Sequence, residues 1–347
     1  AVTLEVYEYW NDLKTTSSEL VDGGGVGGNG RIGRVIYDGL RNNRPVLNIT
    51  RDPVRKLCFL KNEMVIIKDQ RTGRVPTFKC AKRSTAHNNV YWNSKDDAAN
   101  GAFSPMNDAL YSDQVVLDMY VKWLGVPMLV RNGKPWRVTF RVHDQDEKQN
   151  AYYNEGEMVF GEGDDESYPI VAPGVVAHEM SHGFTEQQSG LKYRGQSGGI
   201  NESFSDMADK AVEYFMYGEN NWDIDPELLK EGGHMLRYMD EPTKDCRPTN
   251  EPGVSCSISH VSDYNSDTNV HFSSGIFNKA FVLMAKKWNT RQAFEVMAQA
   301  NMYYWTPSAT FAHAACGVIK AARDYRYDEK VVRDAMKVVG VSTKTCK

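Results

Sequence analysis

The sequence predicts an α+β fold in which a β-rich N-terminal lobe and a mainly helical C-terminal lobe flank one connecting helix. Its 347 residues are enough for two domains at roughly 150 residues each. Short β-rich segments separated by turn residues precede residue 170, and apolar residues with helical spacing follow it. Because strands come first and helices later, a repeating βαβ sheet is disfavoured. We expect the lobes at 1–172 and 191–347 and the connecting helix at 173–190.

The N-terminal lobe should contain several short strands. Asn42-Asn43 and Asn132-Gly133 are typical turn sequences between them. The predicted strands are Arg34–Tyr37, Pro45–Ile49, Leu57–Leu60, Met64–Lys68 and Arg137–Val142.

A glycine-rich stretch, Asp22–Gly30, precedes these strands and has six glycines in nine residues. Within and just after it, Gly28, Gly30 and Gly33 match the G-x-G-x-x-G dinucleotide fingerprint. That fingerprint requires a strand before it and a helix after it. Here polar residues precede the stretch and a predicted strand follows it, so we interpret it as a low-complexity segment and not as a nucleotide site.

The C-terminal half has the three- and four-residue apolar spacing of amphipathic helices. The first predicted helix begins at Pro173, a residue favoured in the first turn of a helix. The predicted helices span residues 173–189, 201–217, 274–288, 291–302, 308–323 and 328–339.

Composition excludes two classes of partner. Apolar residues make up 41% of the chain, enough for a sizeable core, and the net charge is −4. A nucleic-acid binder needs a basic face for phosphate contacts, so we expect no nucleic-acid partner. Mean hydropathy is −0.54 and no apolar run approaches ~20 residues, so we expect no membrane partner. The chain shows no signal peptide and starts at Ala1, which suggests a processed product.

The chain has six cysteines and no C-x-x-C pair, which argues against a thiolate zinc site or a redox motif. Pairing of sequence neighbours gives three disulfides and predicts an extracellular or periplasmic protein. The alternative is six buried thiols in a cytosolic protein. The residues are Cys58, Cys80, Cys246, Cys256, Cys316 and Cys346.

The clearest chemical signal is the H-E-x-x-H sequence of His178, Glu179 and His182 on the predicted helix. Residues four apart share one helix face, so both imidazoles can reach one metal ion while Glu179 contacts water on that ion. The alternative is two ordinary histidines on a helix. The other histidines apart from His271 lack ligand spacing and are interpreted as structural or solvated, namely His87, His143, His234, His260 and His313.

A third ligand candidate, Glu202, follows nineteen residues after His182, on the next predicted helix. A catalytic zinc site needs three protein ligands and one open position. Asp206 lies one helical turn beyond Glu202, where it can accept the free N–H of a metal-bound imidazole. The alternative for Asp206 is a carboxylate on the helix surface.

With these motifs, the sequence resembles the thermolysin family of zinc endopeptidases, and most resembles the branch of secreted bacterial elastases typified by pseudolysin and vibriolysin. The resemblance extends from about Gly24 to the C-terminus. Besides H-E-x-x-H and Asn201-Glu202, it rests on Asn150–Tyr152, Met158–Gly161, Ser189–Gly199, Leu236–Asp240 and Val270–Gly275.

The resemblance implies a thermolysin-like two-lobed fold and a secreted, monomeric endopeptidase that acts on polypeptides and is made as a zymogen with a prosegment. It implies one catalytic zinc ion bound by His178, His182 and Glu202, a ligand set known for this family. Glu179 is then the general base, and Tyr193 and His271 stabilise the oxyanion.

The resemblance also implies residues around the ligands and the substrate. Asn201 and Asp206 support the metal ligands. Asn150 and the backbone of Ala151 hold the substrate extended, and Arg237 bonds a substrate carbonyl. Ile170, Val175 and Leu236 form the candidate walls of a pocket for a bulky apolar residue at P1′, the residue after the scissile bond.

Three features depart from the family pattern. The carboxylate that orients the histidine matching His271 is replaced by Asn269 or Ser266, and Asp267 is the only carboxylate close by. Residues 1–23 are a prosegment tail or an N-terminal extension, because Val6–Leu13 resembles the end of the prosegment. Disulfides Cys58–Cys80 and Cys316–Cys346 match the family, whereas Cys246–Cys256 is an addition.

We further expect the main calcium site of the family to be lost. Its four carboxylate positions correspond here to Gly174, Lys210, Glu213 and Asn221. Calcium needs six to eight oxygen ligands, and an ammonium group at Lys210 would repel it and could pair with Glu213. The alternative is a rearranged site in which Glu213 joins Asp209, Asp223 or Asp225.

Two other functions are alternatives to an endopeptidase. A catalytically weak or non-catalytic binding relative would keep the fold, but lost activity usually appears first as a broken ligand or base. A zinc aminopeptidase would need a carboxylate cluster that captures a substrate N-terminus, and the sequence offers none.

Overall fold

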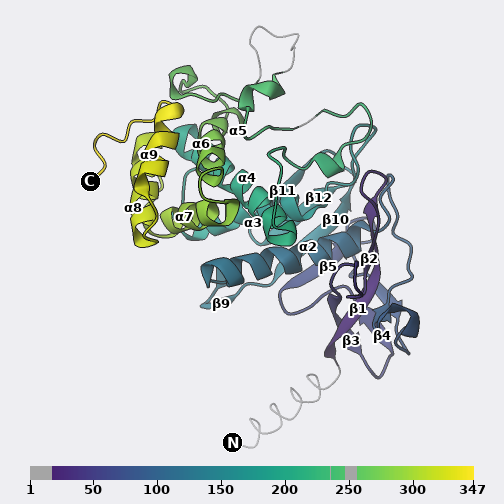
Figure 1. The fold of residues 1–347 in the computed structure, drawn as a ribbon. Coiled ribbons are helices and arrows are strands. Elements are labelled where there is room, and N and C mark those ends of the chain that lie inside the picture. The colour runs from purple at the N-terminus through teal and green to yellow at the C-terminus, as the bar shows by residue number, and fades with distance from the viewer. Residues whose placement is uncertain (1–17, 235, 247–255) are drawn as a thin grey trace, which may run out of the picture.

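Figure 1 presents the computed structural model, which describes residues 18–234, 236–246 and 256–347. Strands gather in the purple and blue N-terminal part, and the green and yellow C-terminal part is helical. The α+β prediction with strands first and helices later is confirmed. Of the predicted prosegment tail, residues 1–17 lie outside the described residues.

The first sheet has the strand order β2-β1-β3-β4-β6, with β7 paired to β1. Three of its strands, β2, β3 and β4, correspond to predicted strands, whereas β1, β6 and β7 were not predicted. The strands are β1 Glu19–Asn29, β2 Gly33–Tyr37, β3 Leu47–Asp52, β4 Leu57–Phe59, β6 Thr77–Lys79 and β7 Tyr91–Trp92.

The glycine-rich stretch, apart from Gly30, lies within strand β1, which the sequence did not predict. Residues Glu19–Gly23 of β1 pair with β3, so residues 19–23 of the predicted tail belong to the sheet. A Cβ atom on Gly25 would lie 2.5 Å from Asn107, and one on Gly27 would lie 1.9 Å from Asp108. Glycine is needed because a helix packs directly on the strand. The following segment is strand β2, not the helix that a dinucleotide site requires.

That helix, α2 Pro105–Met119, was not predicted and continues as a π-helical turn at Tyr120–Leu124. The Ser104 side chain caps it by accepting a hydrogen bond from the Asn107 backbone, and proline follows the cap. Ser104-Pro105 is therefore the signal that identifies its start.

The second sheet has the order β11-β12-β10-β5, so β11 is an edge strand. Its outer backbone groups are free to pair with another extended chain. The strands are β5 Val65–Asp69, β10 Val138–Asp144, β11 Ala151–Asn154 and β12 Glu157–Gly161, and the hairpin β8 Val130–Arg131 and β9 Lys134–Pro135 encloses the predicted Asn132-Gly133 turn.

The helical part begins with α3 Pro173–Gln187 and α4 Gly195–Tyr217, which pack together in the middle of the molecule (Figure 1). Helix α4 starts six residues earlier than predicted, because Gly198 and Gly199 lie inside it. A Cβ atom on either would meet Val270 or Ser273, so these glycines let the short helix α5 approach closely. The remaining helices are α5 Val270–Ser273, α6 Gly275–Ala285, α7 Thr290–Tyr303, α8 Phe311–Asp324 and α9 Glu329–Val338.

The six cysteines form the three predicted disulfides, Cys58–Cys80, Cys246–Cys256 and Cys316–Cys346. One hydrophobic core extends through both parts of the molecule and includes the stacked rings of Phe184, Phe204 and Phe294. Among the residues that the structure describes, no helix combines the length and the hydrophobicity needed to cross a membrane.

Candidate active site

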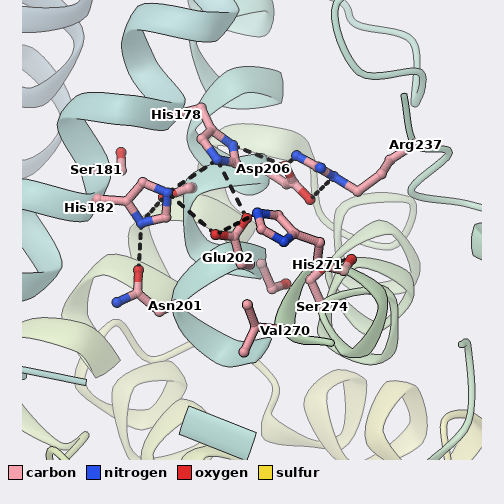
Figure 2. Close-up of polar contacts among 12 residues, drawn as sticks. His178, Ser181, His182, Asn201, Glu202, Asp206, Arg237, Val270, His271 and Ser274 are labelled. Carbon is pink, nitrogen blue, oxygen red and sulfur yellow. Dashed lines mark hydrogen bonds and ion pairs between the residues drawn. The ribbon is translucent and has the colours of Figure 1, made fainter. Parts of the chain in front are cut away.

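Helices α3 and α4 bring three potential metal ligands to one point. His178 and His182 lie one turn apart on α3, and their Nε2 atoms are 3.2 Å apart. Figure 2 shows both rings turned toward Glu202 of α4. Glu202 Oε2 lies 3.6 Å from His178 Nε2, and Glu202 Oε1 lies 3.6 Å from His182 Nε2.

The Nδ1 atoms of both imidazoles have acceptors that fix the rings. His178 Nδ1 lies 3.0 Å from Asp206 Oδ1, and His182 Nδ1 lies 2.7 Å from Asn201 Oδ1. Because these oxygens accept hydrogen bonds, each Nδ1 carries a hydrogen and Nε2 is the nitrogen left for a metal. Asp206 and Asn201 therefore lie where the sequence predicts supporting residues.

The donor set fits zinc. In tetrahedral sites with metal–ligand bonds of ~2.0–2.1 Å, ligand atoms lie roughly 3.3–3.4 Å from one another. The two Nε2 atoms here are 3.2 Å apart, and each lies 3.6 Å from a different oxygen of the Glu202 carboxylate. Glu202 Oε2 is also buried with no hydrogen-bond partner among the described residues, a costly state that a bound cation would relieve.

Asp206 is the centre of a buried network. Arg237 donates two hydrogen bonds to its carboxylate, at 2.9 and 2.6 Å, and Asn278 donates a third at 2.8 Å. Burial raises the pKa of Asp206, but Arg237 and His178 outweigh it and hold the pKa well below its usual range. Burial also lowers the pKa of His178, but Asp206 outweighs it and raises the value to about 9. Metal binding at His178 therefore has to displace a proton.

Glu179 follows His178 on α3 and lines the same cavity without being one of the three clustered ligands. Burial raises its pKa from the ordinary glutamate value, and the neighbouring histidines partly offset this shift. A raised pKa suits a group that accepts and returns a proton near neutral pH.

Tyr193 and His271 lie on the open side of the cluster. The Tyr193 hydroxyl donates to Glu202 Oε1 and lies 3.2 Å from His271 Nε2. His271 Nδ1 lies 3.0 Å from Asn269 Oδ1, so an amide oxygen holds this ring. Neither Ser266 nor Asp267 forms a hydrogen bond or ion pair with His271.

A cavity of about 990 Å³ adjoins the cluster, and we call it the cleft. Every residue predicted to bind substrate lines it: Asn150, Ala151, Ile170, Val175, Leu236 and Arg237. Arg237 is 8% exposed, and its Nη1 has no hydrogen-bond partner among the described residues after Nε and Nη2 bind Asp206.

Sequence reasoning missed other residues of the cleft. His234, interpreted as structural or solvated, lines it and lies 3.4 Å from Glu166. Glu186 and Tyr153 also line it. The signal for Glu186 was available, because it lies four residues after His182 on the same helix face.

The predicted calcium positions form a separate cluster farther along α4, which we call the Lys210 cluster. Lys210 is 1% exposed, and its ammonium lies 2.8 Å from Glu213 Oε2, 3.4 Å from Asp209 Oδ1 and 2.5 Å from the Asp223 carbonyl. Burial lowers the pKa of Lys210, but Asp209 and Glu213 outweigh it and raise the pKa above its usual value. The lysine is therefore charged at neutral pH.

Two family models match the chain. The thermolysin metallopeptidase catalytic domain matches residues 39–186, and the thermolysin metallopeptidase alpha-helical domain matches residues 189–341. The boundary between the two models falls just after helix α3.

Several curated relatives are similar over nearly the whole chain. The zinc metalloproteinase MspA of Legionella longbeachae is 42% identical over 357 residues, covering 100% of this chain and 64% of that protein. The hemagglutinin/proteinase of Vibrio cholerae is 41% identical, covering 99% of this chain and 52% of that protein. The chain thus spans between half and two thirds of their lengths. Among solved structures, the precursor of protealysin, a metalloproteinase from Serratia proteamaculans, matches with a TM-score of 0.64 and 27% identity, covering 81% of this chain and 88% of that one.

Proposed function

Because the chain belongs to the thermolysin family of metallopeptidases, we propose that it is a zinc-dependent endopeptidase that cleaves polypeptides. The observation that carries this proposal is the convergence of His178 Nε2, His182 Nε2 and the Glu202 carboxylate beside a cleft that Glu179 also lines. These are the parts that metal-assisted amide hydrolysis needs.

Bound zinc supplies a Lewis acid that polarises the scissile carbonyl and lowers the pKa of a water molecule toward ~7. Glu179 removes a proton from the attacking water and later returns it to the leaving amine. Tyr193 and His271 donate hydrogen bonds to the developing oxyanion, and Asn269 orients the His271 ring. Asp206 and Asn201 hold the ligand imidazoles in place.

The substrate lies extended along the edge strand β11, with Asn150 and the Ala151 backbone as its partners. Arg237 Nη1 donates to a substrate carbonyl while Asp206 holds the guanidinium. Ile170, Val175 and Leu236 favour a bulky apolar residue at P1′, where burial of a Leu or Phe side chain contributes ~1.5–3 kcal/mol.

The protein is secreted and acts as a monomer after removal of a prosegment. Three disulfides support an oxidising compartment. The main calcium site of the family is absent, and the Lys210 ammonium supplies the positive charge there.

Substitution of Glu179 by Gln tests the function. The variant should bind zinc and fold like the wild type, because Glu179 is not a ligand, while kcat/KM for a peptide falls by about two to four orders of magnitude. Glu219→Gln, at an exposed glutamate outside the cleft lining, is the control and should retain activity. Wild-type activity in Glu179→Gln, or purified protein that binds no zinc, would overturn the proposal.

The P1′ preference is tested separately with a peptide library. We expect cleavage before Leu, Phe and similar residues. A profile dominated by acidic or small residues at P1′ would refute the proposed pocket and leave the zinc chemistry standing.

A further inference from the structure

One carboxylate of the cleft has no part in the proposed mechanism. Glu186 lies on α3 four residues after His182 and eight after His178, so it shares their helix face. At 1.5 Å of rise per residue it lies roughly 6 Å beyond His182 along the helix axis. Its side chain is exposed and lines the cleft.

The direction of α3 places Glu186 relative to the scissile bond. Val175, a wall of the proposed P1′ pocket, precedes His178, whereas Glu186 follows His182. The ligand histidines therefore lie between the P1′ pocket and Glu186. A substrate whose P1′ side chain enters the pocket passes Glu186 with the residues that precede its scissile bond.

The surroundings of Glu186 suit a long side chain. Tyr153 of β11 packs against α3 so closely that a Cβ atom on Gly183 would lie 2.7 Å from the tyrosine Cζ. Leu191 adds an apolar wall to this end of the cleft. The Tyr153 hydroxyl is buried with no side-chain partner among the described residues. Burial, followed by the charge of Glu186, raises the pKa of Tyr153, as expected if the two side chains are neighbours.

No cation of the described part of the chain neutralises Glu186. The one Lys or Arg among the described cleft residues is Arg237, and Asp206 binds its guanidinium. Another exposed carboxylate of the cleft, Glu166, has His234 as its partner. Glu186 is thus an exposed negative charge at the end of an apolar and aromatic wall.

We propose that Glu186 sets a preference for Lys or Arg within the two residues that precede the scissile bond. The aliphatic stem of such a side chain lies along Tyr153 and Leu191, and its charged end reaches the Glu186 carboxylate. This inference rests on the proposed endopeptidase function and adds a substrate class to it.

The test compares kcat/KM for peptides that differ only in carrying Lys, norleucine or Glu at P1 or at P2. Norleucine keeps the stem of lysine without its charge. For the wild type we expect a Lys-to-norleucine ratio of about three to five at one of the two positions, decreasing as salt rises. Glu186→Gln should bring that ratio to about one, and Glu186→Lys should make the Glu peptide the better substrate.

Glu219→Gln is the matched control and should keep the wild-type ratio, because it removes the same charge outside the cleft. An unchanged Lys-to-norleucine ratio in Glu186→Gln, or a wild-type ratio of one at both positions, would overturn the proposal while cleavage itself supports the protease function. Failure of the zinc-loaded wild type to cleave any peptide would instead overturn the proposed function.

Discussion

Helix α4 carries two clusters of buried charge that are satisfied in different ways. Around Glu202, two imidazole nitrogens and a carboxylate face one another, and Glu202 Oε2 has no hydrogen-bond partner among the described residues. Around Lys210, carboxylates of Asp209 and Glu213 face an ammonium group that is 1% exposed. The first cluster has no lysine or arginine among its three groups, and the second is built around a lysine ammonium.

The direction of the lone pairs and hydrogens distinguishes a metal site from an acidic cluster. Both clusters hold acceptor groups in a buried environment, where an unpaired charge is expensive. What distinguishes the Glu202 cluster is that its lone pairs converge and its hydrogens point outward to Asp206 and Asn201. A bound cation fits the converging lone pairs there, whereas at the Lys210 cluster the ammonium offsets part of the negative charge and Asp209 Oδ2 stays buried without a hydrogen-bond partner among the described residues.

Zinc removal should give the largest effect. A zinc-selective chelator should lower activity at least about a thousandfold, because Glu179 and the oxyanion donors have no polarised carbonyl to act on without the metal. Stoichiometric zinc should restore activity. Metal analysis measures the bound zinc, and peptide cleavage measures the activity. Activity that persists in metal-free protein would contradict a catalytic metal site at the Glu202 cluster.

Removal of the internal cation should have the next largest effect. Lys210→Met leaves Asp209 and Glu213 facing each other in a buried site, which should reduce the free energy of unfolding by about 3–5 kcal/mol. Lys287→Met, at an exposed lysine, is the control and should change it by less than about 0.5 kcal/mol. Urea unfolding measures both. Equal stability of the two variants would mean that the ammonium does not offset the carboxylates.

Much of this arrangement could be predicted from the sequence, because it depends on short-range spacing. The i and i+4 relation on one helix defines His178 with His182, and Glu202 with Asp206. The strand and helix segments followed from apolar periodicity in the same way. The relation between Lys210 and Glu213 is likewise a contact within one helix turn.

What could not be predicted depends on contacts between distant segments. Gly25 and Gly27 lie in a strand and leave room for α2 to pack on it, and nothing in the neighbouring sequence indicates this contact. Arg237 reaches Asp206 from a loop, and Tyr153 approaches α3 from the edge strand. The missed α2 had a local signal at Ser104-Pro105, but several of its buried residues are polar, which weakens the apolar pattern.

A buried carboxyl group can also be neutralised by protonation instead of by a neighbouring cation, and α2 contains an example. Asp113 of α2 is 1% exposed, and both of its carboxylate oxygens lack a hydrogen-bond partner among the described residues. Burial raises its pKa to about 8. With no cation beside it, Asp113 is protonated in the folded state at neutral pH.

The sign of its pH dependence follows from this shift. The folded protein binds one proton more than the unfolded chain between about pH 4 and pH 8, so the contribution of Asp113 to stability falls as pH rises through that window. Asp113→Asn should be more stable than the wild type at pH 9 by about 1–3 kcal/mol, with a smaller gain at pH 5. Asp118→Asn, at an exposed position of α2, should give no such trend. A pH-independent difference in unfolding free energy would contradict a protonated Asp113.

Calcium removal should have the smallest effect, and it tests the second cluster directly. Because the Lys210 ammonium already lies against Glu213, Asp209 and the Asp223 carbonyl, a calcium ion would face a like charge among its ligands. With zinc kept saturated, removal of calcium should shift the melting temperature of the wild type by no more than about 1 °C. Lys210→Met should respond more, since its carboxylates are then open to a cation. A large drop for the wild type that micromolar calcium reverses would show that the cluster rearranges to bind the ion, and that an internal ammonium does not exclude a metal.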